Sequence, residues 1–355
     1  MYRLDYVSFL GLTGYGQAAR NNIAALLEDK NFDVKLTPLD LNYRKSINKT
    51  HQDYAPLIEK SIDRQRTLIL HCIPDMSRRF AKNLCTLGWG TFETWEPPKH
   101  WIALLNQNDG CIVPSTFCKQ ILEEQNLVVP IFVIPHCLDV NIYHQDIKPM
   151  YSWKRFSFLF LGTWKKRKGY DLLLSAWQKA FSHKDNVQLV IKTDRPLIAQ
   201  AEVRKNMSHG SAKIFVDPKR YSPEEMPNFI KSANCLVAPT LGEAFFFPGL
   251  EAMAVGIPVI ISDHSGCREY ATEDTAILLE PTGKKFYKTM DGIPQFSNKN
   301  WITLSEEELI SALQNIFRDP AGVRKQVYSA ASMVRERFSY SIARKNFQEM
   351  FDQLR

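Results

Sequence analysis

The sequence from Pro239 to Tyr270 reads PTLGEAFFFPGLEAMAVGIPVIISDHSGCREY, and it carries the clearest local pattern in the chain. A short apolar run ending at Pro239 indicates a buried parallel strand. After a turn, Pro248 suits the first turn of a helix, where its missing N–H costs nothing, and Gly256 suits the end of that helix. Residues 258–262 form a second apolar run. Strand, loop, helix and strand predict a right-handed crossover, with the loop at the carboxyl edge of an α/β sheet, where such sheets bind ligands.

Two acids lie in this crossover, Glu243 in the predicted turn and Glu251 in the predicted helix, with seven residues between them. The free N–H groups of the helix start lie between these acids and suit a phosphate group. Carboxylates fit beside such a site if they accept hydrogen bonds from neutral hydroxyls, as on a sugar and a ribose. The alternative is that both are surface acids, which stabilise a helix start in any protein.

With its flanks, the segment Glu243-Ala-Phe-Phe-Phe-Pro-Gly-Leu-Glu251 resembles the Glu-x7-Glu signature of retaining glycosyltransferases of the GT-B fold, family 4 (glycosyl transferases group 1). The resemblance continues at Ser265-Gly266 and Glu269. It implies that Glu243 contacts the donor sugar and Glu251 the nucleotide ribose. The backbone amides that it assigns to the diphosphate are those of Ala244, Phe245, Phe246 and Phe247. Phe246 and Phe247 replace a small and an aliphatic residue, which predicts an unusual sugar pocket.

A basic loop, Thr163-Trp-Lys-Lys-Arg-Lys-Gly169, lies between a predicted strand at 156–162 and a predicted helix at 170–181. This order places cations at the carboxyl end of a strand, where they suit a diphosphate, although a solvated surface loop has the same composition. The loop resembles the family pattern Gly-Arg-x-x-x-x-Lys-Gly-x-Asp at Lys168, Gly169 and Asp171, with Thr163 in place of the arginine. The resemblance implies that Lys168 stabilises the leaving diphosphate. Either Arg167 supplies the second positive charge, or the site has one positive charge fewer than is usual in the family.

The N-terminal region predicts a strand at 6–10, a glycine loop at 11–16 and a helix at 17–28. Gly14 and Gly16 fit the start of a dinucleotide-binding fingerprint, and Asp40 lies near the end of the next strand. An NAD-dependent oxidoreductase is therefore the alternative function, although Pro38 disturbs the strand before Asp40. In the glycosyltransferase family, a similar loop faces the donor phosphates and the acceptor.

His71 ends the apolar strand predicted at 67–72. The segment His71-Cys-Ile-Pro74 resembles the family's His-x-Pro loop with one extra residue, which implies that His71 lies beside the donor sugar. The alternative is a structural histidine hydrogen-bonded to a neighbouring segment. Glu93 and Glu96 could equally orient an acceptor or cap the next helix.

The composition is that of a soluble globular chain with 355 residues, 23% charged residues and a formal charge of +7. No apolar run approaches the roughly 20 residues of a membrane-spanning helix. Seven cysteines without Cys-x-x-Cys spacing predict reduced thiols and a cytoplasmic location. The basic residues are dispersed among acids, and the sequence contains no recognisable nucleic-acid module, so no specific nucleic acid is expected.

We therefore expect an α/β protein of the GT-B class, with two facing Rossmann-like domains and a donor cleft between them. Its parts are an N-terminal acceptor domain (residues 1–148), a C-terminal donor domain (155–335) and a C-terminal helix (336–355) that crosses back. The resemblance implies transfer of a hexose, with retention, from a nucleotide diphosphate sugar (UDP-glucose first, GDP-mannose second) to a glycan, a lipid-linked acceptor or another hydroxyl. Peripheral contact with a membrane is compatible with a lipid-linked acceptor. The sequence has no Asp-x-Asp motif, and neither a metal nor a cofactor is expected.

Overall fold

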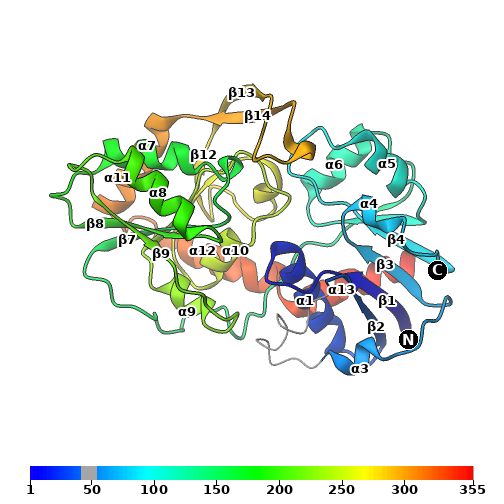
Figure 1. Ribbon diagram of the computed structural model, residues 1–355. Helices are drawn as coiled ribbons and strands as arrows, with labels where there is room; N and C mark the ends of the chain where they lie inside the picture. The colour runs from blue at the N-terminus through cyan, green and yellow to red at the C-terminus, as the bar shows by residue number, and fades with distance from the viewer. Residues whose placement is uncertain (41–53, 355) are drawn as a thin grey trace. The chain divides into compact units, whose positions relative to one another are not determined.

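The computed structural model describes residues 1–40 and 54–354. The chain divides into two compact units, Met1–Asp139 with Glu336–Arg355, and Val140–Arg335 (Figure 1). Residues 140–148 therefore belong with the second unit, although the sequence placed them in the first domain. Contacts within the second unit hold this segment: Tyr143 donates to the carboxylate of Glu251, and Asn228 Nδ2 donates to the carbonyl of Lys148.

The first unit is built on a six-stranded sheet in the order β2-β1-β3-β4-β5-β6, with every neighbouring pair parallel. Parallel strands need crossovers, and the helices between them supply these. The strands are β1 (Tyr2–Ser8), β2 (Phe32–Pro38), β3 (Thr67–His71), β4 (Cys85–Trp89), β5 (Gly110–Val113) and β6 (Ile131–Val133). The helices are α1 (Gly14–Leu27), α3 (Ala55–Ile58), α4 (Pro74–Ser77), α5 (Lys99–Leu105), α6 (Thr116–Glu124) and, from the end of the chain, α13 (Tyr340–Gln353).

The first strand begins at Tyr2, four residues before the start expected from the sequence. The expectation was wrong because Arg3 and Asp5 interrupt the apolar run. Both have polar partners in the fold: Arg3 pairs with Asp63, and the carboxylate of Asp5 accepts a hydrogen bond from Thr37 at 2.9 Å. Paired polar side chains are compatible with a buried strand.

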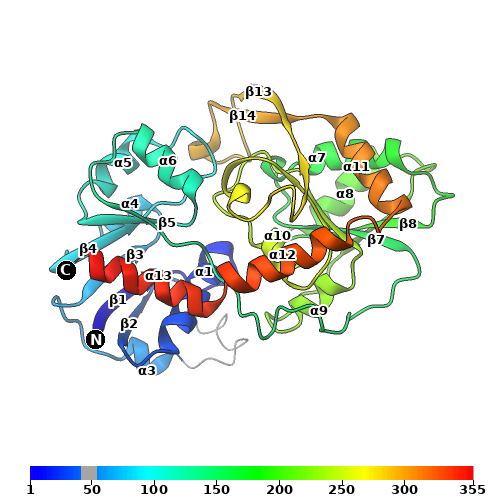
Figure 2. The same ribbon diagram turned by 180° about the vertical axis from the view of Figure 1, so that it is seen from behind.

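Helix α13 packs on α1 and completes the core of the first unit (Figure 2). Its Phe347, Met350 and Phe351 belong to one buried cluster with residues of β1 and α1. At its surface, Arg344 donates to the carboxylate of Glu28 at 2.8 Å. The last helix is thus an integral part of the N-terminal unit.

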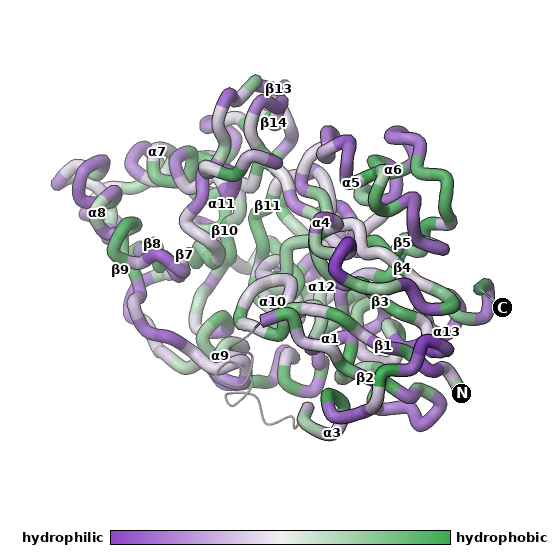
Figure 3. Tube along the Cα trace, turned by 45° about the vertical axis from the view of Figure 1, so that its right-hand side comes forward, coloured by the Kyte–Doolittle hydropathy of each residue, from purple (hydrophilic) through white to green (hydrophobic). Residues whose placement is uncertain are grey.

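The second unit has its own parallel six-stranded sheet, in the order β12-β11-β10-β7-β8-β9. The strands are β7 (Phe156–Leu161), β8 (Val187–Lys192), β9 (Lys213–Asp217), β10 (Cys235–Ala238), β11 (Val259–Ser262) and β12 (Ile277–Leu279). The helices are α7 (Tyr170–Ala180), α8 (Pro196–Asn206), α9 (Met226–Lys231), α10 (Phe247–Ala254), α11 (Glu306–Arg318) and α12 (Arg324–Arg337). In Figure 3, β10 and β11 are drawn mainly in green, as expected for strands buried on both faces.

The second unit also contains an element that the sequence did not predict, an antiparallel hairpin of β13 (Pro281–Tyr287) and β14 (Lys299–Leu304). The hairpin forms a sheet of its own (Figure 1). Met290, Trp301 and Ile302 are buried and cluster with Leu241, which precedes the predicted sugar-binding acid. The hairpin therefore joins the unit beside the loop that follows β10.

All seven cysteines lie within the described residues, and each is a free thiol there. Among the same residues, none of the helices combines the length and apolar character required to cross a membrane.

Candidate functional site

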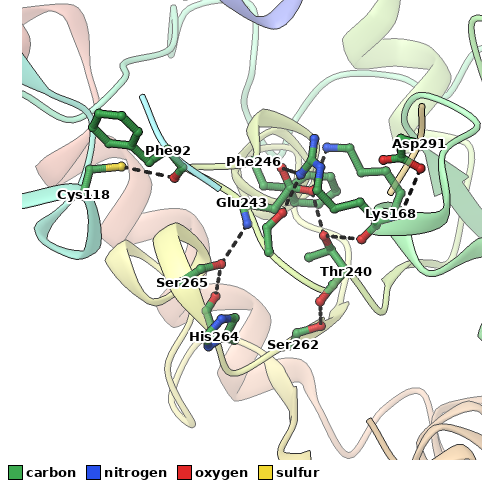
Figure 4. A network of polar contacts seen from close by, with 12 residues as sticks. Phe92, Cys118, Lys168, Thr240, Glu243, Phe246, Ser262, His264, Ser265 and Asp291 are labelled. Carbon is green, nitrogen blue, oxygen red and sulfur yellow. Dashed lines mark hydrogen bonds and ion pairs between the residues drawn. The ribbon is translucent and has the colours of Figure 1, made fainter. Parts of the chain in front are cut away.

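Glu243 is the centre of a polar cluster between the end of β10 and the start of α10 (Figure 4). Its side chain is 6% exposed and contacts two cations. Lys168 Nζ lies 2.6 Å from Oε1, and Arg167 Nη1 lies 3.0 Å from Oε2. Thr240 also donates to Oε1, at 2.7 Å. Both carboxylate oxygens are thus engaged by charged or hydroxyl donors.

The turn at Ser265-Gly266 holds the backbone of this loop. The amide of Glu243 donates to Ser265 Oγ at 2.9 Å, and the amide of Gly266 donates to the carbonyl of Glu243 at 2.8 Å. A Cβ on Gly266 would lie 1.9 Å from the carbonyl oxygen of Ala244, so only glycine permits this approach. The residues that resembled the family turn therefore fix the position of Glu243.

The basic loop forms a short 3-10 turn, Lys166–Lys168, which packs directly on the loop after β10. The carbonyl of Arg167 accepts from the amide of Leu241 at 2.8 Å, and Arg167 Nη1 also donates to the carbonyl of Gly242. Gly169 has a φ of +72°, and a Cβ there would lie 1.9 Å from the carbonyl oxygen of Pro239. The two loops are thus in contact through their backbones as well as through their charges.

The electrostatics of the cluster favour an ionised Glu243. Burial alone would raise the pKa of this carboxyl, but attraction to Lys168 and Arg167 and hydrogen bonds from Lys168 and Thr240 outweigh it and hold the pKa below its usual value. One carboxylate between two cations leaves one unit of positive charge. The cluster therefore suits an anion together with a neutral hydrogen-bond donor.

Arg167 is the second cation beside Glu243. Its side chain is buried, whereas Thr163, at the position of the usual family arginine, is exposed at the beginning of the loop. Thr163 contributes its carbonyl to the turn, where it accepts from the amide of Lys165 at 2.8 Å. Whether Arg167 serves a diphosphate in place of the family arginine stays a prediction.

The four residues from Ala244 to Phe247 are all buried, and they lead into α10. Phe246 has left-handed backbone angles (φ 75°, ψ 81°), which cost a bulky residue on the order of 1–3 kcal/mol. Two contacts hold it: Tyr270 donates to its carbonyl at 2.7 Å, and Lys168 Nζ lies 5.0 Å from the centre of its ring. The phenyl ring that departs from the family pattern therefore packs on the candidate catalytic lysine.

Glu251 lies in α10 and is buried, and Tyr143 donates a hydrogen bond to its Oε1 at 3.2 Å. The sequence did not indicate Tyr143, because the segment around it is polar and irregular. An isolated tyrosine in such a segment carries no periodic signal that could have identified it.

His71 lies at the end of β3 in the first unit and is buried as a neutral imidazole. Burial, together with the nearby His136, holds its pKa well below the usual value. Its Nδ1 lies 2.7 Å from the hydroxyl of Tyr6, and that hydroxyl accepts from Asn22 Nδ2 at 3.1 Å. The tyrosine hydroxyl is thus shared between the side chains of His71 and Asn22. The imidazole ring stacks on Trp89 with centroids 3.8 Å apart.

The predicted glycine loop begins α1 in the same unit. Gly14 is the first residue of the helix, and the space around it is open. Gly16 is enclosed, since a Cβ there would lie 1.9 Å from the carbonyl oxygen of Gly11. The carboxylate of Asp40 accepts a hydrogen bond from the amide of Leu10 at 2.8 Å, so part of the predicted ribose partner is used by the protein's own backbone. The relation of His71 and this loop to Glu243 stays a prediction.

Within residues 1–40 and 54–354, no group of three or more histidine, cysteine, aspartate or glutamate side chains is arranged to hold a metal ion.

Comparison with known families and proteins gives a consistent result. Residues 155–292 match the sequence profile of the family described as "Glycosyl transferases group 1". A curated relative, lipopolysaccharide 1,2-N-acetylglucosaminetransferase of Salmonella typhimurium (strain LT2), is 27% identical over 186 residues. That match covers 48% of this chain and 48% of the relative, so it spans about half the length of each. The resemblance to group 1 glycosyltransferases stated from the sequence is thereby confirmed.

Two solved structures resemble the whole chain. One is Anabaena HepE in complex with UDP and glucose, with a TM-score of 0.71 and 13% identity over 99% of this chain and 100% of that one. The other is sucrose-phosphate synthase from Thermosynechococcus elongatus, with a TM-score of 0.70 and 16% identity over 100% of this chain and 99% of that one. At such identities these likenesses concern the fold, which is that of the GT-B glycosyltransferases. None of these matches supports the oxidoreductase alternative.

Proposed function

We propose that this protein is a retaining glycosyltransferase that transfers a hexose from a nucleotide diphosphate sugar to a hydroxyl acceptor. The observation that carries the proposal is the convergence of Lys168 and Arg167 on Glu243, between the carboxyl end of β10 and the start of α10. The match of residues 155–292 to group 1 glycosyl transferases supports it, because that segment contains all three side chains.

The donor diphosphate would lie against Lys168, Arg167 and the backbone amides at the start of α10. Both cations and a helix N-terminus stabilise phosphate charge, and a bidentate guanidinium adds geometric specificity. Glu243 is ionised and buried, so it would accept a hydrogen bond from a hydroxyl of the donor sugar. Glu251, held by Tyr143, would accept from the ribose in the same way.

The chemical step would depend on electrostatic stabilisation of the leaving group. As the bond to the sugar breaks, negative charge develops on the diphosphate, and preorganised cations stabilise that charge more than they stabilise the substrate. We propose that Lys168 fills the role of a divalent ion, so that the reaction needs no metal and no cofactor. The leaving phosphate itself would take the proton of the acceptor on the same face of the sugar, and no protein base is assigned. His71 would contact the donor sugar through its neutral imidazole.

UDP-glucose is the first donor we propose and GDP-mannose the second. The structural likeness to HepE, which was solved in complex with UDP and glucose, favours UDP. The acceptor would be a glycan, a lipid-linked glycan or another hydroxyl compound, and we propose a peripheral contact with the membrane for a lipid-linked one.

A thermal-shift panel with UDP, GDP, ADP and NAD tests the proposal. UDP or GDP should raise the midpoint of unfolding, because a ligand that binds only the folded state stabilises it by mass action. Stabilisation by NAD alone would refute the transferase function. NMR of the product formed from the matching nucleotide sugar then reports whether the anomeric configuration is retained.

A further inference from the structure

The β13–β14 hairpin contacts the basic turn that carries Arg167 and Lys168. We propose that this hairpin is a positioning element, in which Asp291 and Phe296 hold Arg167 in place for the diphosphate of the donor. The proposal rests on the proposed function, and it assigns a role to residues outside the sequence motifs that led to that function.

Asp291 caps the basic turn. Its Oδ1 accepts from the amide of Lys166 at 2.7 Å and lies 3.5 Å from the amide nitrogen of Arg167, and its carbonyl accepts from Lys165 Nζ at 2.9 Å. The first amides of a helical turn have no partner within the turn, so a side-chain acceptor fixes their direction. Asp291 reaches them from a left-handed backbone conformation (φ 58°), and Gly292 follows it with a φ of 68°. The carboxylate of Asp291 therefore lies beside the basic turn (Figure 4).

Phe296 supports the side chain of Arg167. The guanidinium carbon lies 5.1 Å from the centre of the phenyl ring, within the range of a cation–π contact. The ring itself is held by Trp301, which packs edge-on against it at 5.6 Å and donates from Nε1 to the carbonyl of Phe296 at 3.1 Å. Trp301 is buried in the cluster that includes Leu241. The support for Arg167 is thus anchored in the core of the hairpin.

Arg167 is consequently held on several sides. Its amide faces Asp291, its carbonyl accepts from the amide of Leu241, and its Nη1 is directed at Glu243 and the carbonyl of Gly242. A long side chain loses rotamer entropy when it binds a ligand, and a guanidinium that is fixed beforehand loses less. The hairpin would therefore raise the affinity of the site for a diphosphate without contacting it.

With this support, Arg167 can supply the second positive charge beside Lys168, although Thr163 occupies the position of the usual family arginine. An arginine within a short turn has no strand of the main sheet to fix its backbone. Asp291 and Phe296 supply that support from the hairpin.

Calorimetric titration of UDP and GDP, with uridine and guanosine as controls, tests the proposal in the full chain. Asp291→Ala should weaken binding of the nucleoside diphosphate about five- to tenfold, as expected for the loss of a capping acceptor, and should leave nucleoside binding unchanged. Asp291→Asn should bind within about twofold of the wild type, because the amide Oδ1 still accepts from Lys166. Phe296→Leu, which keeps an apolar side chain but removes the ring, should also weaken diphosphate binding selectively. Thr282→Ala, on the exposed part of β13, is the matched control and should bind like the wild type.

Hydrogen exchange gives a second readout that needs no ligand. The amides of Lys166 and Arg167 should exchange faster in Asp291→Ala than in the wild type, while those of β7 and α7 should not change. Wild-type affinity for diphosphate in both Asp291→Ala and Phe296→Leu would overturn the inference and leave the proposed function intact. Absence of diphosphate binding by the wild type would overturn the proposed function and the inference with it. Should Asp291→Ala fail to fold, Phe296→Leu carries the test, with the same outcomes deciding it.

Discussion

Replacement of Glu243 by glutamine is expected to destabilise the second unit strongly. The carboxylate is 6% exposed, and its partners Lys168 and Arg167 have side-chain exposures of 13% and 10%. Removing one member of a buried ion pair costs about 3–5 kcal/mol, because the remaining charge stays buried without compensation. Glutamine has nearly the same shape, so little of this loss comes from packing. We therefore expect the free energy of unfolding to fall by about 3–5 kcal/mol at pH 7.5.

Urea unfolding followed by circular dichroism measures this difference, with Glu349→Gln as the control. Glu349 forms an exposed pair with Lys345, four residues earlier on α13, and its loss should cost no more than about 0.5 kcal/mol. The double variant Glu243→Gln/Lys168→Met should be less destabilised than the sum of the single variants, since it removes one of the two uncompensated cations. A Glu243→Gln protein as stable as Glu349→Gln would refute the buried ion cluster.

The stability difference between the wild type and Glu243→Gln is expected to depend on pH. The folded pKa of Glu243 is lowered from the usual 4.5, so its stabilising contribution is complete above that value and is lost as the pH falls through the folded pKa. The stability difference between the wild type and Glu243→Gln should therefore be constant from pH 7.5 to about pH 5 and shrink in stronger acid. A difference that grows on acidification would have the wrong sign for a lowered carboxyl pKa.

Three further substitutions test separate parts of the description. Lys168→Met should lower kcat in the transferase assay by roughly 10²–10³-fold, the range for loss of one preorganised electrostatic donor. Lys166→Met is the control in the same turn and should keep a kcat near that of the wild type, because its side chain is 48% exposed. Gly266→Ala should lower the free energy of unfolding by at least about 1–3 kcal/mol, because a Cβ would lie 1.9 Å from the carbonyl oxygen of Ala244. A urea midpoint equal to that of the wild type would contradict this close contact. Tyr6→Phe should lower the free energy of unfolding by about 1 kcal/mol, because it removes the hydroxyl that contacts His71 Nδ1 and Asn22 Nδ2. The nitrogen-15 shifts of the His71 imidazole should change as well, and unchanged shifts would show that this contact is not made.

The fold of each unit follows from sequence patterns because its strands are short apolar runs separated by helical periodicity. The crossover from β10 through α10 to β11 was predicted with nearly correct bounds, since Pro248 and Gly256 mark the ends of its helix. The sequence also placed Glu243 and Lys168 in loops that follow strands, and the structure brings their side chains within 2.6 Å of each other, while their roles stay a prediction. Where a side chain follows such a strand directly, its neighbourhood is set by the topology of the sheet.

The hairpin could not be predicted in this way. Its first strand has Lys284 and Lys285 side by side in a largely exposed segment, so the alternation that marks a strand buried on one face is lost. The contact that gives the hairpin its role joins Lys166 to Asp291 across 125 positions, and no local pattern encodes such a separation. Tyr143 and Glu251 illustrate the same limit, being 108 positions apart.

Thr163 occupies the position where the family pattern has an arginine, and this difference bears on what a diphosphate site requires of its sequence. Stabilisation of a diphosphate depends on where the guanidinium lies relative to the phosphate oxygens and not on the position in the chain from which it extends. Arg167 reaches Glu243 from a short turn and is supported by Phe296 from a separate hairpin. An arginine at Thr163 would begin from the end of β7 and would have a different path to the same oxygens. A motif with one residue missing can therefore keep its charge arrangement, provided that another element of the fold holds the substitute in place.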